Sequence, residues 1–339
     1  MQPEFNWQPP AAAPMPDPLF AGNGTALWLR AGATSCDEWY PKIEEFMLLR
    51  VMQNRFLSTA VPGCGHSLGA AGALVKPVGA EAATLRRMFT QMDSLAVAVT
   101  PAVAMGAKTL RAVMHSAAAV KRFGAALAQE CALQGYDGFV LTPDTSDFNA
   151  SDGAALVSLM HSLAAALGPG ASLGLELSGS FEAITAPLPA EVIVYVSGET
   201  ASRDFAAFSA AVSAAISRFG ERALSVGLSL DGASWWSGTK RPSITDVQTR
   251  LTALTLASVR QIALAVDWLD PEYLADQSRL DLVQLTMLTP FRGVAGMQWE
   301  TISVRFAASS PHITAHSDSF CFGLPATSGR VGGDSRDMG

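Results

Sequence analysis

Short apolar segments alternate with longer, alanine-rich segments along most of this chain, and this alternation constrains the fold more than any other feature. The apolar segments have the length and composition of buried parallel strands. In the longer segments, apolar residues recur at three- and four-residue steps, as in helices packed on a sheet. The expected strands are Ala26–Leu29, Phe56–Val61, Leu95–Thr100, Gly138–Thr142, Ser172–Leu177, Val192–Ser197, Leu224–Leu230 and Val294–Trp299.

The expected helices lie between these strands. They are Glu38–Val51, Glu81–Gln91, Ala118–Leu133, Gly153–Leu167 and Phe205–Phe219. Eight parallel strands are the number that closes a (β/α)8 barrel with its helices outside. An open, doubly wound sheet has the same alternation. We predict an α/β fold of the TIM-barrel type and keep the open sheet as the alternative.

Two segments fit the alternation poorly. Gly63–Gly79 reads as a long loop of Gly, Ala and Pro. Ser234–Leu288 is long enough to be an insertion between the seventh and eighth strands, and it contains Trp235 and Trp236. Because inserted barrel loops often build the substrate site, we expect a site residue here.

Composition agrees with one large folded domain. The chain has 339 residues, of which 49% are hydrophobic and 16% are charged, and a single barrel uses about 250 residues. We expect one barrel domain over residues 21–325. Residues 1–20, rich in Pro and Ala, and residues 326–339, rich in Gly, Ser and charge, are expected to be disordered tails.

Charge and cysteine usage exclude several classes of partner. The net charge of −7, with no dense Lys/Arg cluster, argues against a nucleic-acid partner. The four cysteines have no paired spacing, which indicates reduced thiols rather than a zinc site. The N-terminus lacks the pattern of a secretory signal, and the most apolar stretch is too short to span a membrane. We therefore expect a cytoplasmic protein with no cofactor and no metal.

Two weaker patterns are kept as alternatives. Gly63-Cys-Gly65 follows an apolar strand like a dinucleotide-binding loop, but its spacing is not that of the fingerprint. His312 and His316 are four residues apart, which would bring two imidazoles together on a helix for metal binding.

A carboxylate directly follows the expected fourth strand. Gly135 has the character of a helix-ending glycine, and the apolar run Phe139–Leu141 then leads to Asp144. A carboxylate at the C-terminal end of a buried strand lies where α/β barrels carry out catalysis. An Asp before Thr-Ser is also typical of an exposed turn or a helix cap.

The segment Asp137-Gly-Phe-Val-Leu-Thr-Pro-Asp144 resembles the D-G-x-D-x-D-x-E strand of glycoside hydrolase family 18, the chitinase-like barrels. Leu224–Trp236 resembles the seventh strand of that family and its loop, and Gly293–Glu300 resembles the eighth. Val192–Ser197 would be the sixth. The likeness spans residues 25–305 in short patches. It implies a TIM barrel whose ligand is an N-acetylhexosamine glycan.

The resemblance assigns roles to individual residues. Asp144 would be the general acid, with Asp137 and Thr142 at the other motif positions. The expected substrate-binding residues are Trp299, Tyr195, Trp235, Trp236 and Glu300, with Trp299 as the floor of the sugar site.

The departures from the family pattern concern the catalytic groups. The acid is Asp144 instead of Glu, and a misplacement of about 1 Å can cost about 100-fold in rate. The Asp that orients the acetamido group is replaced by Thr142, and the sixth-strand Asp by Ser197. A second barrel family, of endo-N-acetylglucosaminidases, reads D-G-W-x-I-N-x-E. The apolar residues Phe139–Leu141 fit this second pattern better, but Thr142 and Asp144 again stand in place of its Asn and Glu.

Two functions remain open. One is a glycoside-hydrolase-like barrel that binds or weakly hydrolyses N-acetylhexosamine glycans; if it is active, Asp144 is its acid. The other is a barrel without catalysis that serves as a scaffold or structural subunit with protein partners. An aromatic cleft above Asp144 favours the first, and a plugged barrel mouth favours the second.

Overall fold

The computed structural model describes residues 24–29, 36–38, 40–41, 59–63, 65–95, 97–177, 181–196, 204–220, 223–229, 244–259 and 261–265. All of these belong to one structural unit, Met1–Gly296; a second unit, Met297–Gly339, lies outside the described residues. The expected tails, 1–20 and 326–339, also lie outside them.

One sheet contains the described strands. They are β1 (Gly24–Leu29), β2 (Thr59–Pro62), β3 (His66–Leu68), β4 (Leu74–Val75), β5 (Ala98–Val99), β6 (Ala102–Met105), β7 (Gly138–Pro143), β8 (Ser172–Leu177), β9 (Val192–Val196), β10 (Leu224–Ser229) and β11 (Gln261–Ala265). Their order is β4-β3-β6-β7-β8-β9-β10-β11-β1-β2-β5. Every pair is parallel except β3 with β4.

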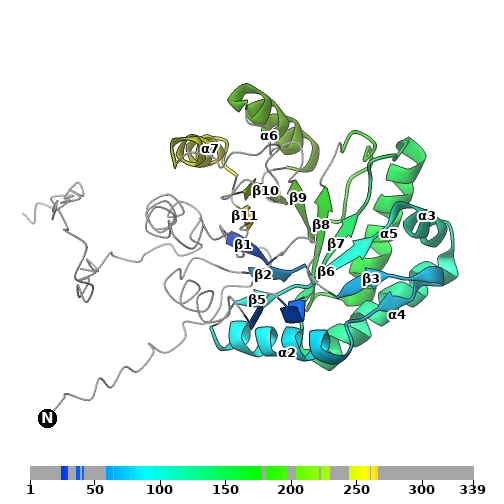
Figure 1. Cartoon of the computed structure of the whole chain (residues 1–339). Coiled ribbons are helices and arrows are strands. Elements are labelled where there is room, and N and C mark those ends of the chain that lie inside the picture. Colours follow the sequence, from blue (N-terminus) through cyan, green and yellow to red (C-terminus); the bar gives the residue numbers. More distant parts are fainter. Residues whose placement is uncertain are drawn as a thin grey trace, which may run out of the picture. The chain divides into compact units, whose positions relative to one another are not determined.

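The strand order follows the chain from β6 to β11 and then continues through β1 to β2. A doubly wound sheet would reverse its order at a switch point, so this alternative is not what the structure shows. Figure 1 shows the strands grouped around a common centre, with the helices on the outside.

The chain from β5 to β6 forms backbone hydrogen bonds with both β2 and β7. Only Thr100 and Pro101 separate β5 from β6. The Thr100 N–H donates to the carbonyl of Ala60 on β2 at 3.0 Å, and the Val140 N–H on β7 donates to the carbonyl of Pro101 at 3.0 Å. The stretch from β5 to β6 therefore lies between β2 and β7.

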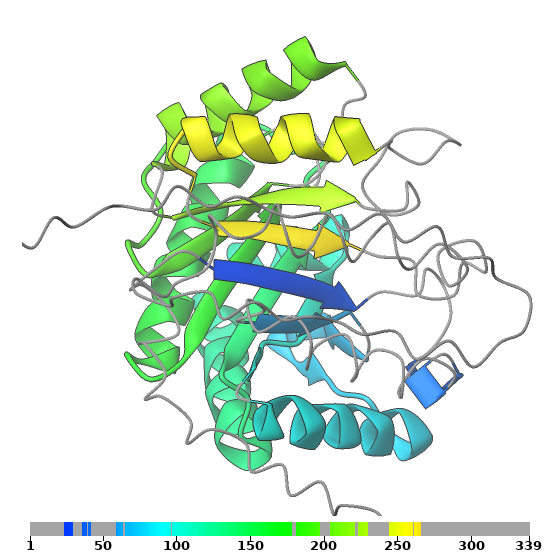
Figure 2. The ribbon, with the colours of Figure 1, turned by 90° about the vertical axis from the view of Figure 1, so that its left-hand side faces the viewer.

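Four of the described helices correspond to expected helices, whereas those over residues 107–114 and 244–256 were not expected. The described helices are α2 (Gly79–Ser94), α3 (Ala107–Met114), α4 (Ala117–Gln134), α5 (Ala150–Leu167), α6 (Phe205–Phe219) and α7 (Ile244–Leu256), with a short 3-10 turn, η1 (Ala70–Gly72). The bounds of α6 are those expected, and α2, α4 and α5 differ from expectation by a few residues. Most of the helix expected over Glu38–Val51 lies outside the described residues. Figure 2 shows α6 and α7 beside β10 and β11.

The segment Gly63–Gly79 is not the plain loop that we expected. It contains β3, η1 and β4, and β3 pairs with β6 in the main sheet. Strands of two and three residues are too short to show an alternating pattern, which is why the sequence did not indicate them.

The expected insertion Ser234–Leu288 was also wrong in part. It contains α7 and the strand β11, which pairs with β10 on one side and with β1 on the other. The place next to β1 is therefore taken by Gln261–Ala265, and the expected strand Val294–Trp299 lies outside the described residues.

Two apolar clusters lie on opposite faces of the sheet. The larger one joins the strands to the surrounding helices and includes Phe139 and Leu141. The smaller one contains the intervening residue Val140, because successive side chains of a strand point to opposite faces. Its members come from five strands and are Val61, Ala102, Val140, Ile193, Tyr195 and Ala263.

Two glycines set the start of β7. Gly135 ends α4 in the left-handed conformation, with φ 78°, as the sequence predicted. Gly138 has φ 152°, and a Cβ there would lie 2.0 Å from the carbonyl oxygen of Ser172 on β8. The glycine of the Asp-Gly motif is thus needed for the close approach of β7 to β8.

Candidate functional site

The two predicted carboxylates lie at opposite ends of β7. Asp137 directly precedes the strand and Asp144 directly follows it. Seven residues of extended chain span roughly 23 Å. The paired carboxylates of glycosidases lie about 5–9.5 Å apart, so these two residues cannot act together on one bond. Asp144 lies at the C-terminal end, where barrels carry out catalysis.

The Asp144 side chain is exposed and bonded within its own turn. Its Oδ1 accepts a hydrogen bond from the Ser146 hydroxyl at 2.8 Å and another from the Ser146 N–H at 3.3 Å. These two bonds, with a smaller contribution from the positive charge of Arg111, lower the pKa of Asp144 below its ordinary value. The group is therefore ionised at neutral pH, which is unfavourable for a general acid.

Arg111 of α3 holds the loop that follows Asp144. Its Nη2 donates to the carbonyl of Asp147 at 2.6 Å, and its Nε donates to Oδ2 of Asp152 at 3.3 Å. The guanidinium group also lies 5.5 Å from the centre of the Phe148 ring. Contacts of this kind stabilise a turn, which agrees with the structural interpretation of Asp144.

At the other end of β7, Asp137 has a structural hydrogen bond. Its Oδ2 accepts from the Val99 N–H at 2.7 Å, which ties the start of β7 to β5. Partial burial raises the pKa of Asp137, and the bond from Val99 opposes this rise. Asp137 therefore has a structural contact with the backbone of β5.

Thr142 lies between these two residues on β7. Its hydroxyl donates to the carbonyl of Val103 on the neighbouring strand β6 at 3.1 Å, and its side chain is half-buried. The hydroxyl proton is thus used within the sheet, and the oxygen keeps only its accepting capacity.

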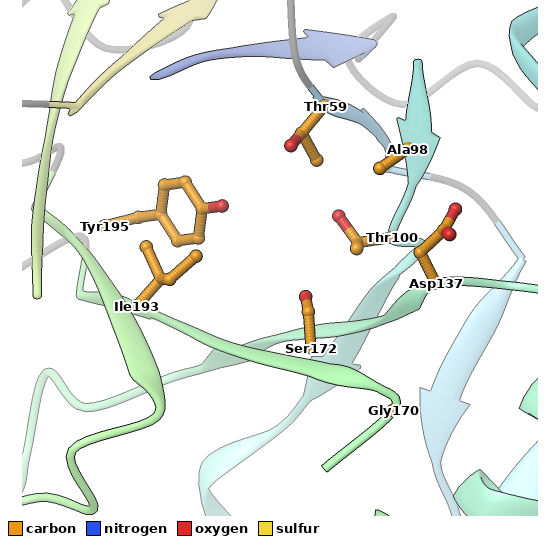
Figure 3. A pocket seen from close by; sticks show the side chains of 8 residues that line it. All are labelled: Thr59, Ala98, Thr100, Asp137, Gly170, Ser172, Ile193 and Tyr195. Carbon is orange, nitrogen blue, oxygen red and sulfur yellow. The ribbon is translucent and has the colours of Figure 1, made fainter. Parts of the chain in front are cut away.

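Tyr195 lies inside the protein. It is 3% exposed, and a Cβ at Gly174 would meet its ring at 2.8 Å, so the ring occupies the space that this glycine leaves. Burial raises the pKa of its hydroxyl. Figure 3 shows the hydroxyl directed into a cavity that Thr59, Asp137 and other residues line. A sugar at the C-terminal rim would reach Tyr195 only if the interior opened.

Glu176 was not among the predicted site residues. It is the one acidic residue in the described strands, it is 3% exposed, and its register partner is Tyr195 on β9. Its neighbours Leu175 and Leu177 belong to the larger apolar cluster, which joins the strands to the helices, so Glu176 occupies the other face of β8. The signal was present in the sequence as a charge within an apolar strand, which is rare unless the residue has a role.

The remaining predicted residues lie outside the described part of the chain. They are Trp235, Trp236, Ser197, Trp299, Glu300, His312 and His316. The roles proposed for them stay predictions. Within the described residues, no group of three or more His, Cys, Asp and Glu side chains is arranged to hold a metal ion.

One described helix, α5, is long and apolar enough to cross a membrane, with a mean hydropathy of 1.3. Its Leu156, Leu159 and Leu163 are buried in the cluster that joins the helices to the sheet. A core helix of a soluble protein has the same properties, so α5 is weak evidence for a membrane span.

Comparison with known proteins supports the fold. No protein-family model matches the sequence, and no curated protein matches it. A class V chitinase from Pseudomonas fluorescens Pf-5 matches in structure with a TM-score of 0.57 and 14% identity, over 76% of this chain and 99% of that one. This chain has a chitinase-like fold.

Two further structures agree. A chitinase from Bacteroides thetaiotaomicron matches with a TM-score of 0.61 and 10% identity, over 78% of this chain and 96% of its own. The spore cortex-lytic enzyme SleL from Bacillus megaterium QM B1551 matches with a TM-score of 0.58 and 10% identity, over 78% of this chain and 74% of that one. The distant resemblance to chitinase-like barrels that the short motifs indicated is thus confirmed.

Proposed function

We propose that this protein is a catalytically degenerate, chitinase-like barrel that binds N-acetylhexosamine glycans at the C-terminal ends of its strands. The observation that carries the proposal is the pair of hydrogen bonds from Ser146 to Asp144. An exposed aspartate is ionised at neutral pH at its ordinary pKa, and these bonds lower the pKa further instead of raising it, so the residue at the family's acid position has no proton to give to a leaving group. Hydrolysis is therefore weak or lost.

The proposal includes a closed barrel within one domain. The stretch from β5 to β6 bonds to β2 on one side and to β7 on the other, and this supports closure of an eight-stranded ring. Parallel strands in such a ring direct all their C-terminal loops to one face. Trp235 and Trp236 follow β10 in the sequence, so they would reach that face.

Glycan binding can outlast the loss of catalysis because the two depend on different groups. Stacking on a sugar requires an exposed aromatic ring face, not a proton donor. We therefore assign binding to Trp235, Trp236 and Trp299, with Glu300 as a polar contact. The class of ligand follows from the chitinases that share the fold.

A scaffold or structural subunit is the second candidate. It is favoured because each of the described motif residues makes a hydrogen bond with the protein itself. Asp137 bonds to Val99, Thr142 bonds to Val103, and Asp144 bonds to Ser146. These three motif residues need no ligand to satisfy the bonded side-chain atoms.

Titration of tryptophan fluorescence with chitooligosaccharides, run beside a fluorogenic chitobioside assay, separates the two candidates. We expect saturable binding with little turnover, and we expect Trp235→Ala, Trp236→Ala or Trp299→Ala to weaken it. Phe205→Ala is the matched control, because Phe205 is an exposed aromatic residue on the outer helix α6. Absence of binding up to millimolar ligand favours the scaffold.

A further inference from the structure

A small, partly enclosed cavity lies at the end of the sheet opposite the proposed glycan site. Its volume is about 30 Å³. Thr59 and Ser172 are the first residues of β2 and β8, and Asp137 directly precedes β7, so the cavity lies at the N-terminal ends of the strands. Tyr195 reaches it from within β9.

The lining is rich in hydroxyl groups. Figure 3 shows the side chains of Thr59, Thr100, Ser172 and Tyr195 around the same space. Thr100 is 2% exposed, and its Oγ1 has no hydrogen-bond partner in the described protein. A buried hydroxyl without a partner is destabilising, so this atom requires a partner that the described residues do not provide.

We propose that this cavity is a binding site for one or two structural water molecules that bridge Thr100 Oγ1 to the hydroxyls of Ser172 and Tyr195. A cavity holds a water when it offers about 10–15 Å³ and two or more polar partners, and this one meets both conditions. An apolar cavity of this size would stay dry.

The charges around the cavity select a neutral occupant. Among the described lining residues, Asp137 is the one acidic residue, and its carboxylate is bonded to the Val99 N–H on β5. The other polar groups are neutral hydroxyls, which both donate and accept hydrogen bonds. Water matches this chemistry, whereas a bound cation would need carboxylate or carbonyl ligands directed at it.

The site also explains the choice of residues at this end of the sheet. Barrel interiors are usually filled by branched apolar side chains in layers. Here Ala98, Gly170 and Ser172 leave space that Ile193 and Tyr195 do not fill. Bound water completes the packing and provides hydrogen bonds at the start of the strands. This inference does not rest on the proposed glycan site.

The test is a count of long-lived internal water in the intact protein. A high-resolution crystal structure and oxygen-17 relaxation dispersion in solution are both suitable. We expect one or two waters in the wild type, with at least one bonded to Thr100. Thr100→Val keeps the shape of the side chain but removes the hydroxyl, and it should release at least one water.

Thr84→Val is the matched control, because Thr84 is a buried threonine on α2 that does not line the cavity, and its water count should not change. If Thr100→Val does not fold, Tyr195→Phe carries the same expectation. A dry cavity in the wild type, a cation in place of water, or an unchanged water count in the folded cavity variants would overturn the proposal.

Discussion

Asp144 Oδ1 accepts hydrogen bonds from both the hydroxyl and the N–H of Ser146, at 2.8 and 3.3 Å. Both bonds favour the charged carboxylate, and this lowers the pKa of Asp144. In the family pattern this position belongs to a glutamic acid that must hold a proton. The same strand end therefore carries a group suited to stabilise a turn and poorly suited to donate a proton.

Asp144→Asn should leave hydrolysis of a fluorogenic chitobioside at its low wild-type rate, because an ionised carboxylate contributes no acid catalysis. Loss of a working general acid would instead lower the rate by about 10²–10⁴-fold. The same assay on Glu176→Gln shows whether the acidic residue inside the described sheet contributes to hydrolysis. A fall of that size on Asp144→Asn would show that Asp144 is a working acid.

Ser146→Ala should raise the pKa of Asp144 toward its ordinary value near 3.8, because it removes the hydroxyl donor. A depressed folded pKa adds stability that is present above the unfolded value and is lost as the pH falls through the folded value. The stability advantage of the wild type over Asp144→Asn should thus shrink below about pH 4. NMR titration of the Asp144 carboxyl carbon measures the pKa directly, and an unshifted pKa in Ser146→Ala would contradict the assignment.

Asp137→Ala should destabilise the protein by about 1–3 kcal/mol, because it leaves the Val99 N–H without its partner. Asp137→Asn keeps an oxygen acceptor and should therefore lose less stability than Asp137→Ala. Denaturant unfolding measures the stability of both variants, with the exposed Glu191→Ala as the control. Equal stability of the alanine variant and the wild type would mean that the bond between β5 and β7 contributes nothing.

Gly138→Ala should cost on the order of 3 kcal/mol or prevent folding, because the new Cβ would lie 2.0 Å from the Ser172 carbonyl oxygen. Gly106→Ala provides the comparison, since a Cβ there meets no atom within 4 Å. Thermal unfolding of the two variants, side by side, reports the difference. Similar melting temperatures would show that β7 can shift away from β8 at little cost.

Features that depend on neighbouring residues could be predicted from the sequence. The bounds of α6 and β8 agree with expectation, and Gly135 ends α4 with a left-handed backbone. Periodicity and helix-ending glycines are local signals, and each acts within a few residues of chain.

The candidate site depends on contacts between residues that are far apart in the sequence. Asp137 bonds to Val99, 38 residues away, and β11 takes its place in the sheet by pairing with β10 and β1. The interior positions of Glu176 and Tyr195 follow from the register of β8 with β9, and a shift of one residue would exchange the two faces. The sequence by itself therefore determined most of the longer strands and helices, but not β3, β4, β6, β11, α3 and α7. Only the tertiary structure decided which side chains face the interior, because strand register is set by pairing between segments and not within them.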